Sequence, residues 1–355
     1  MILALRASAF KKIKHIFSGP DIPWSEKGGR AMKRFEGAVS ALSPPLRDRL
    51  LRVKTNIKRE TYEVRLRAGQ PLVLFGRYGS CALLEDGTLS DVPAQNCVRL
   101  ASSDLQDCFQ RLCAYSVHSF QSEIVSGFIT LQNGHRAGVC GTAVTDANGK
   151  IMSLRNVSSL NLRIAREAPG CALPLLEQLK AVPGGLLIAG PPGGGKTTLL
   201  RDLIRLLAGG SGGPAQKVCV ADARQELAAV RDGTAQNDVG WNTDVLTGYP
   251  TAAAIEIALR TLSPQVMVCD ELVTDDELEA VRSGVNAGVR FIASVHAAGR
   301  DDLLTRRVIC ALLETEAFSS VALLKSGGQP GRVETMMDAK ELRDEIYARR
   351  VGLVF

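Results

Sequence analysis

Short apolar runs, each followed by a polar residue or a glycine, recur along the second half of the chain. They occupy residues 185–189, 218–221, 266–269 and 291–295. Runs of four or five residues without polar alternation are typical of strands that are buried on both faces of a sheet. Segments with helical spacing of apolar residues, such as 198–204, lie between these runs. This alternation predicts an α/β domain with a parallel sheet covered by helices.

The pattern between residues 32 and 166 is mixed. It predicts strands at 62–67, 72–76 and 128–131, and a helix at 105–115. The dipeptides Asn133-Gly134 and Asn148-Gly149 favour hairpin turns, so part of this region is expected to be antiparallel. We therefore predict a smaller mixed α/β domain at 32–166. The domain with the parallel sheet follows at 167–355 and contains a glycine-rich linker at 209–214.

The front of the chain is basic. The first 70 residues contain 16 Lys or Arg and 6 Asp or Glu, whereas the whole chain has a net charge of +6. Residues 1–18 combine basic side chains with apolar residues at helical spacing, which is compatible with an amphipathic helix on an anionic membrane surface. We favour a flexible leader at 1–31, because residues 19–29 are rich in Gly, Pro and charge and would separate such a helix from the fold.

Composition excludes several classes of protein. The 355 residues are 45% hydrophobic, as expected for two globular domains and not for a disordered or fibrous chain. Nine cysteines occur without a C-x-x-C pair, which predicts free thiols in a reducing compartment, with no disulfide and no zinc site. No apolar run approaches the ~18 residues that span a bilayer, so we expect no integral membrane segment and a cytoplasmic protein.

A phosphate-binding loop lies between the first apolar run of the second domain and its first predicted helix. It reads Gly190-Pro191-Pro192-Gly193-Gly194-Gly195-Lys196-Thr197 and fits the pattern G-x-x-x-x-G-K-[ST] at every fixed position. Backbone N–H groups of such a loop close around phosphates, and Lys196 is expected to reach the β and γ phosphates. Thr197 is a candidate Mg²⁺ ligand, and Thr198 adds a second hydroxyl. The alternative, a glycine-rich turn with an incidental lysine, does not explain the flanking pattern.

Acidic residues at the ends of later apolar runs complete a candidate catalytic set. Asp270 and Glu271 follow the run at 266–269 as in a Walker B motif, in which Asp270 would hold Mg²⁺ and Glu271 would activate water. Asp222 and Glu226 follow the run at 218–221, and either acid is a second candidate for assisting the water. His296 follows the run at 291–295 and is a candidate contact to the γ phosphate. A solvated acidic turn and a structural histidine are the competing interpretations.

The residues described so far resemble the stage III sporulation protein AA family, P-loop ATPases related to the secretion ATPases of type II and type IV machines. The resemblance runs from about Met32 to about Asp338. In the first domain it rests on Glu63-Val64-Arg65-Leu66-Arg67, Gly127-Phe128-Ile129-Thr130, Gly134-His135-Arg136-Ala137-Gly138-Val139-Cys140-Gly141 and Asn161-Leu162-Arg163-Ile164-Ala165-Arg166-Glu167. In the second it rests on Thr243-Asp244-Val245-Leu246, Ser263-Pro264-Gln265-Val266, Asp270-Glu271 and Ser294-Val295-His296-Ala297.

The resemblance implies a RecA-like ATPase domain that uses ATP and Mg²⁺. It further implies a homo-oligomer, a hexameric ring, at the cytoplasmic base of a membrane channel or secretion complex built during endospore formation. In related secretion ATPases an acidic box supplies the glutamate that activates water, which corresponds to Glu226, and a histidine box corresponds to His296. The chain has Ala223 and Val273 where the family usually has Glu and Gly, and these departures predict slow hydrolysis.

Two other functions are compatible with the sequence. P-loop domains of this kind also move nucleic acid, but the chain has 5% aromatic residues and no aromatic cluster on which bases could stack, so nucleic acid is not expected. A nucleotide-binding scaffold with little hydrolysis is the third possibility. An arginine of the first domain is a candidate arginine finger toward the nucleotide of its own or of a neighbouring subunit, and the candidates are Arg65, Arg67, Arg136, Arg155, Arg163 and Arg166.

Overall fold

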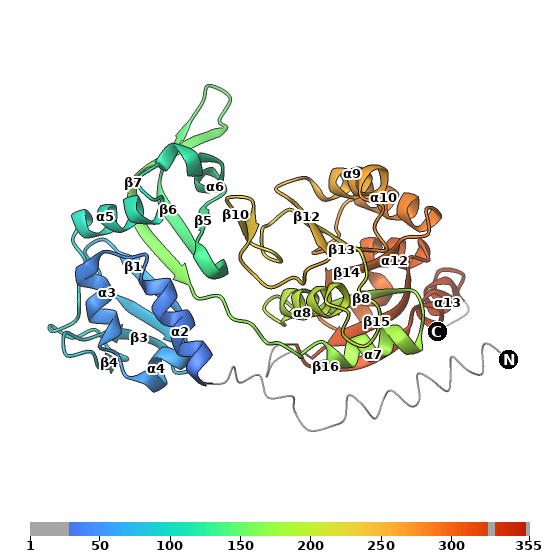
Figure 1. The fold of residues 1–355 in the computed structure, drawn as a ribbon, viewed down its shortest axis with the longest axis horizontal. Helices are drawn as coiled ribbons and strands as arrows, with labels where there is room; N and C mark the ends of the chain where they lie inside the picture. The colour runs from blue at the N-terminus through green and yellow to red at the C-terminus, as the bar shows by residue number, and fades with distance from the viewer. Residues whose placement is uncertain (1–27, 326–330, 353–355) are drawn as a thin grey trace. The chain divides into compact units, whose positions relative to one another are not determined.

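The computed structural model of the protein describes residues 28–325 and 331–352. These residues form two compact units, each with its own hydrophobic core. The N-terminal unit holds residues 28–166 and 230–236, and the C-terminal unit holds residues 167–229, 237–325 and 331–352 (Figure 1). The predicted leader lies outside the described residues except for residues 28–31. Within the described ranges, no helix has the length and apolar character needed to cross a bilayer.

A seven-stranded sheet organises the N-terminal unit. Its strands are β1 (Thr61–Arg67), β2 (Val73–Gly76), β3 (Gly79–Leu83), β4 (Leu89–Ser90), β5 (Phe128–Thr130), β6 (Arg136–Thr145) and β7 (Ile151–Arg163). They lie in the order β4-β3-β2-β1-β7-β6-β5, and every neighbouring pair is antiparallel. The distal half of the long β6–β7 hairpin projects from the rest of this unit (Figure 1).

Helices supply the other half of the N-terminal core. They are α2 (Gly28–Val39), α3 (Pro44–Leu51), α4 (Thr55–Glu60), α5 (Ser102–Leu112) and α6 (Gln121–Val125). Helix α5 buries Leu105, Phe109 and Leu112 at the spacing of one helical face. It ends before the predicted limit of residue 115, because Ala114 and Tyr115 adopt left-handed φ angles of 47° and 60°.

A short hairpin from the middle of the second domain's sequence belongs to the N-terminal unit. Its strands are β10 (Val230–Arg231) and β11 (Thr234–Ala235). The Arg231 Nη1 donates to the carbonyl oxygen of Thr130 at 3.2 Å, and its guanidinium lies over the ring of Phe120. The backbone N–H of Asn133 donates to Gln236 Oε1 at 3.0 Å. The sequence-based division assigned these residues to the 167–355 domain; these long-range contacts place them elsewhere.

The C-terminal unit has the predicted parallel sheet. Its strands are β8 (Gly185–Gly190), β9 (Val218–Asp222), β12 (Thr243–Thr247), β13 (Val266–Cys269), β14 (Arg290–His296), β15 (Phe318–Leu324) and β16 (Val333–Asp338). Their order is β12-β9-β13-β14-β8-β15-β16, and each neighbouring pair is parallel except β15–β16. The α/β fold class predicted from the apolar runs is therefore confirmed, with one antiparallel edge strand added.

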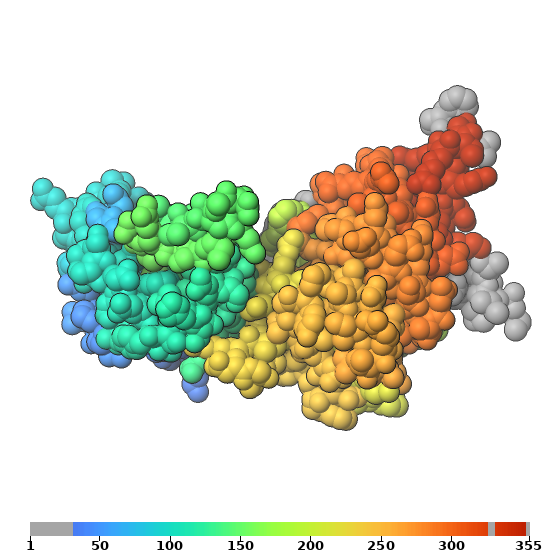
Figure 2. All heavy atoms as spheres, turned by 90° about the horizontal axis from the view of Figure 1, so that it is seen from above, coloured from blue at the N-terminus to red at the C-terminus, as the bar shows by residue number. Residues whose placement is uncertain are grey.

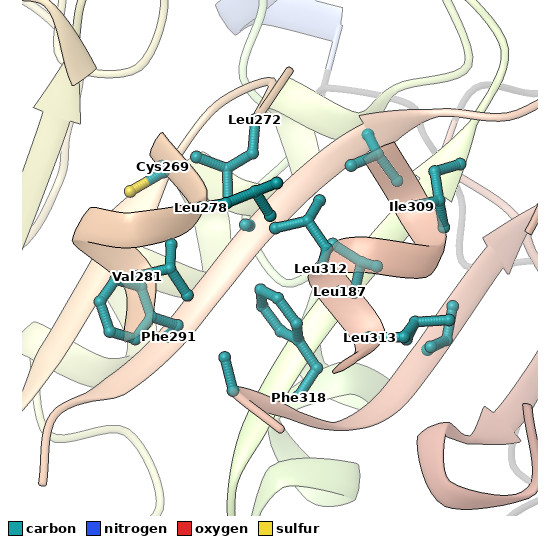
Figure 3. Packing of buried hydrophobic residues seen from close by; sticks show 14 of the residues in the cluster. Leu187, Cys269, Leu272, Leu278, Val281, Phe291, Ile309, Leu312, Leu313 and Phe318 are labelled. Carbon is teal, nitrogen blue, oxygen red and sulfur yellow. The ribbon is translucent and has the colours of Figure 1, made fainter. Parts of the chain in front are cut away.

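Every residue of β8, β9 and β13 is buried, because helices cover both faces of this sheet. The helices are α7 (Leu173–Ala181), α8 (Lys196–Ala208), α9 (Thr251–Thr261), α10 (Asp275–Asn286), α11 (Arg300–Thr305), α12 (Arg307–Glu314) and α13 (Ala339–Arg350). Figure 3 shows Phe291 near Val281 and Phe318 near Leu312 in the core. Helix α13, red in Figure 2, lies on the surface of this unit and contacts α11 and α12.

A buried histidine makes the N-terminal unit sensitive to acid. His135 is 1% exposed, and its Nδ1 accepts the backbone N–H of Ala165 at 3.0 Å, while its Nε2 has no hydrogen-bond partner. Burial and, to a smaller extent, the positive charge of Arg34 together lower the pKa of His135 from 6.5 to about 4. Between these pH values the unfolded chain binds a proton at this position and the folded chain does not.

We therefore expect the free energy of unfolding to fall as the pH is lowered from 6.5 toward 4. The expected loss at pH 5 is about 2 kcal/mol relative to neutral pH. Urea unfolding at pH 7 and pH 5 measures it, and His135→Gln should flatten this pH dependence even if it lowers stability at neutral pH. An equally steep dependence in the variant would assign the acid sensitivity to other groups.

Candidate active site

The loop between β8 and α8 has the backbone conformation of a phosphate cradle. Gly193 and Gly195 adopt φ angles of 70° and 90°, which residues with a Cβ rarely adopt. A Cβ on Gly190 would lie 2.8 Å from Leu324 Cβ, so β15 leaves no room for a side chain there. The loop ends directly at the first turn of α8, where Thr198 also lies. The arrangement fits nucleotide phosphates, because unpaired N–H groups and the positive end of a helix meet at the same point.

Lys196 is the buried cation of this loop and is 5% exposed. Its Nζ lies 3.0 Å from the carbonyl oxygens of Gly190 and Pro191 and 3.0 Å from His296 Nδ1. Burial lowers the pKa of Lys196, and the charges of Glu271 and Asp270 partly offset this effect. The ammonium group is thus held against the backbone at the start of the loop, close to Asp270 and Glu271.

Asp270 is the centre of the candidate metal site. The Thr197 hydroxyl donates to Asp270 Oδ2 at 2.9 Å, and the Ser294 hydroxyl donates to Asp270 Oδ1 at 2.5 Å. Burial raises the pKa of Asp270, and the two hydroxyl groups act in the opposite direction. Ser294 was missed as a site residue by sequence reasoning, although a hydroxyl within the apolar run at 291–295 was a signal that could have found it.

Glu271 and His296 form the next layer of the site. Glu271 Oε1 lies 2.6 Å from His296 Nε2, and Arg224 Nη1 pairs with the other carboxylate oxygen. The backbone N–H of Glu271 donates to Ser294 Oγ at 3.1 Å. The φ of Glu271 is 55°, a left-handed conformation that costs a non-glycine residue about 1 kcal/mol or more. His296 therefore connects the loop lysine to the second Walker B acid.

The loop that carries Glu226 is built around Asp222. The two carboxylate oxygens of Asp222 accept the backbone N–H groups of Glu226, Leu227 and Ala228 at 2.8–3.1 Å. Arg201 on α8 donates to the carbonyl oxygens of Glu226 and Leu227. Asp222 is 1% exposed and occupied by these bonds, so it shapes the loop and is not free to activate water. Burial raises the pKa of Asp270, and the negative charge of Glu226 raises it to a smaller extent.

Sheet topology explains why distant residues meet here. Strands β9, β13, β14 and β8 are consecutive in the sheet and parallel, so their carboxyl ends lie along one edge. His296 pairs in register with Gly190, and Cys269 pairs with both Ala221 and Ala293. The residues after these positions therefore converge, as ligand-binding residues do in open α/β sheets.

The donor set fits magnesium shared with phosphates. Asp270 and Thr197 offer oxygen ligands, and Mg²⁺ commonly takes one or two protein oxygens together with substrate phosphates and water. Within residues 28–325 and 331–352, no cluster of three or more His, Cys, Asp or Glu side chains could hold a metal by itself. The residues present thus suit a metal that binds with its nucleotide.

Several arginines singled out in the first domain have partners inside the N-terminal unit. Arg65 and Arg163 both pair with Glu63. Arg166 donates to the carbonyl oxygen of Thr61 and lies over the ring of Tyr62. These contacts lie within the N-terminal unit, and an arginine finger from this unit stays a prediction. Arg224, which no motif singled out, contacts Glu271 in the candidate site.

Comparisons with known proteins agree with this architecture. The family model described as "Sporulation stage III, protein AA" matches residues 32–343. Stage III sporulation protein AA of Bacillus subtilis (strain 168) is 34% identical over 281 residues, which cover 79% of this chain and 87% of that protein.

Solved structures of an ATPase and of a pilus retraction motor show the same fold. The Legionella pneumophila ATPase DotB superposes with a TM-score of 0.51 at 16% identity, covering 87% of each chain. The pilus retraction motor PilT with bound ADP gives a TM-score of 0.52 at 15% identity, covering 82% of this chain and 85% of that one. These likenesses confirm the RecA-like fold with an N-terminal domain. Because the family match spans most of its length, the chain belongs to the stage III sporulation protein AA family.

Proposed function

We propose that this protein is a Mg²⁺-dependent ATPase that works as the motor of a sporulation-specific secretion or channel complex. The observation that carries the proposal is the convergence of the glycine loop, Lys196, Thr197 and Asp270 at one edge of the sheet. These are the groups that ATP hydrolysis needs: a phosphate cradle, a cation for the β and γ phosphates, and oxygen ligands for the metal.

The nucleotide would be held mainly by backbone groups. N–H groups of Gly193 to Thr197 would bind the phosphates, and Lys196 would move its Nζ from the loop carbonyls to the phosphate oxygens. Thr198 would add a hydroxyl in the first helical turn. Thr197 and Asp270 would hold Mg²⁺, which supplies positive charge that orients the phosphates and neutralises their developing charge.

We assign water activation to Glu271. It directly follows Asp270, and its left-handed φ of 55° is maintained by the hydrogen bond of its backbone N–H to Ser294 and by the contact of its side chain with His296. Strained backbone of this kind is concentrated at functional sites. Glu226 would be a second carboxylate beside Asp270 that tunes the charge of the metal site. His296 would couple a movement of Lys196 to Glu271, since it contacts both side chains.

The biological setting is proposed from the relatives. The B. subtilis relative is named for sporulation stage III, and the solved neighbours are named as an ATPase and as a pilus retraction motor. The assembly that we propose, as the resemblance to the family implies, is a hexameric ring on the cytoplasmic side of a membrane that acts on partner proteins of a channel. Such a ring would attach to the membrane through its partners.

ATP turnover by the purified full chain, measured across a range of protein concentrations with the mass of the particles followed in parallel, tests this function. We expect turnover that requires Mg²⁺ and that rises as oligomers form. Single-stranded DNA at moderate salt should leave the rate unchanged. Turnover that is independent of assembly would contradict the ring, and strong stimulation by DNA would favour a nucleic-acid motor.

A further inference from the structure

The carboxylate of Glu271 is engaged on both of its oxygens. Oε1 lies 2.6 Å from His296 Nε2, and Oε2 forms an ion pair with Arg224 Nη1. The Glu271 side chain is 14% exposed, whereas that of Arg224 is 59% exposed. The ion pair thus joins a mostly buried carboxylate to a largely solvent-exposed guanidinium.

This arrangement is unsuited to activating water. A general base must accept a proton from a water molecule, and a guanidinium on the same oxygen competes for its lone pairs. His296 also contacts Lys196, so the chain of contacts runs from Arg224 through Glu271 and His296 to the loop lysine. Arg224 is the member of this chain that solvent can reach most easily.

Arg224 is also placed by the same loop that presents Glu226. It follows the end of β9 by two residues, and the next residue, Gln225, has a left-handed φ of 54°. Asp222 fixes the loop by accepting three backbone N–H groups, so the backbone at Arg224 has little freedom. Opening of the ion pair therefore has to come from the arginine side chain and not from the backbone.

We propose that Arg224 is a positioning residue that restrains Glu271, so that turnover is proportional to the fraction of molecules in which this ion pair is open. The proposal rests on the assignment of Glu271 as the residue that activates water. An ion pair with one largely exposed partner is weak, so it opens readily and a nearby water molecule can then reach Oε2. Arg224 thereby sets a basal rate below the one that the catalytic groups themselves allow.

The test compares kcat and nucleotide affinity of Arg224→Ala with those of the wild-type chain, at saturating ATP and Mg²⁺. We expect kcat to rise about two- to fivefold, the range that corresponds to losing one weak ion pair. The dissociation constant for ATPγS should not change. Arg224→Lys keeps the charge but loses the forked geometry, so its kcat should lie between the two. The matched control is Arg282→Ala on α10, which removes an exposed pair with Glu279 and should leave kcat unchanged.

Salt provides an independent readout. Raising the ionic strength from about 0.01 M to about 0.15 M screens exposed charges, so kcat of the wild-type chain should rise more than kcat of Arg224→Ala. A kcat of Arg224→Ala at or below the wild-type value, with folding intact by circular dichroism, overturns the proposal. If Glu271→Gln turns over ATP as fast as the wild-type chain, Glu271 is not the general base. The proposed role of Arg224 is then wrong as well, because it depends on that assignment.

Discussion

Replacing Lys196 with alanine is expected to abolish ATP hydrolysis and to weaken ATP binding about 10- to 100-fold, the range for losing a charged hydrogen bond. The reason is geometric: Lys196 is the buried cation at the curl of the loop, and its Nζ already lies against the carbonyl oxygens of Gly190 and Pro191. Turnover and equilibrium binding of a fluorescent ATP analogue measure the two effects. Lys180→Ala is the matched control, because it removes an exposed lysine paired with Glu177 on α7.

The same substitution should change the stability of the C-terminal unit little. Burial lowers the pKa of Lys196, so the folded protein disfavours its charge, and losing that charge offsets the loss of its hydrogen bonds to the carbonyl oxygens of Gly190 and Pro191. The melting temperature of Lys196→Ala is therefore expected to stay close to that of the wild-type chain. Full turnover in a folded Lys196→Ala protein would contradict the proposed phosphate site, whereas an unfolded variant would contradict the stability argument.

Glu271→Gln is expected to lower kcat by about 10²- to 10⁴-fold, the usual contribution of a general base. The amide keeps the size of the side chain but cannot accept the proton of the attacking water. ATP binding should be retained, because Lys196, Thr197 and Asp270 are unchanged. Single-turnover hydrolysis and the nucleotide content of the purified protein measure the two properties, and we expect ATP, not ADP, to stay bound.

Glu226→Gln is the matched comparison. It removes a carboxylate near Asp270 and keeps the loop, because Asp222 bonds to the backbone of Glu226 and not to its side chain. Its effect on kcat should be smaller than that of Glu271→Gln. The reverse ranking would transfer water activation to Glu226, as the resemblance to secretion ATPases implies, and normal activity of both variants would leave neither acid as the base.

Local sequence was sufficient to predict the phosphate loop and the parallel sheet of this protein. The phosphate loop at 190–197 could be predicted because its conformation depends on glycines at fixed spacing, and the parallel sheet could be predicted because buried strands need apolar residues at every position. The acids at the ends of apolar runs pointed to the right edge of the sheet, since parallel strands share one carboxyl edge. Family membership followed from the same motifs.

Only the tertiary structure determined which partners the polar residues at that edge have. Asp222 and Glu226 look alike in the sequence, yet the Asp222 carboxylate accepts three backbone N–H groups that fix the loop on which Glu226 lies. The roles of Ser294 and Arg224 depend on hydrogen bonds to Asp270 and Glu271 across neighbouring strands. The assignment of residues 230–236 to the N-terminal unit depends on contacts with residues about a hundred positions away. No local pattern encodes such partners, because the partner of a side chain is determined by strand order and register.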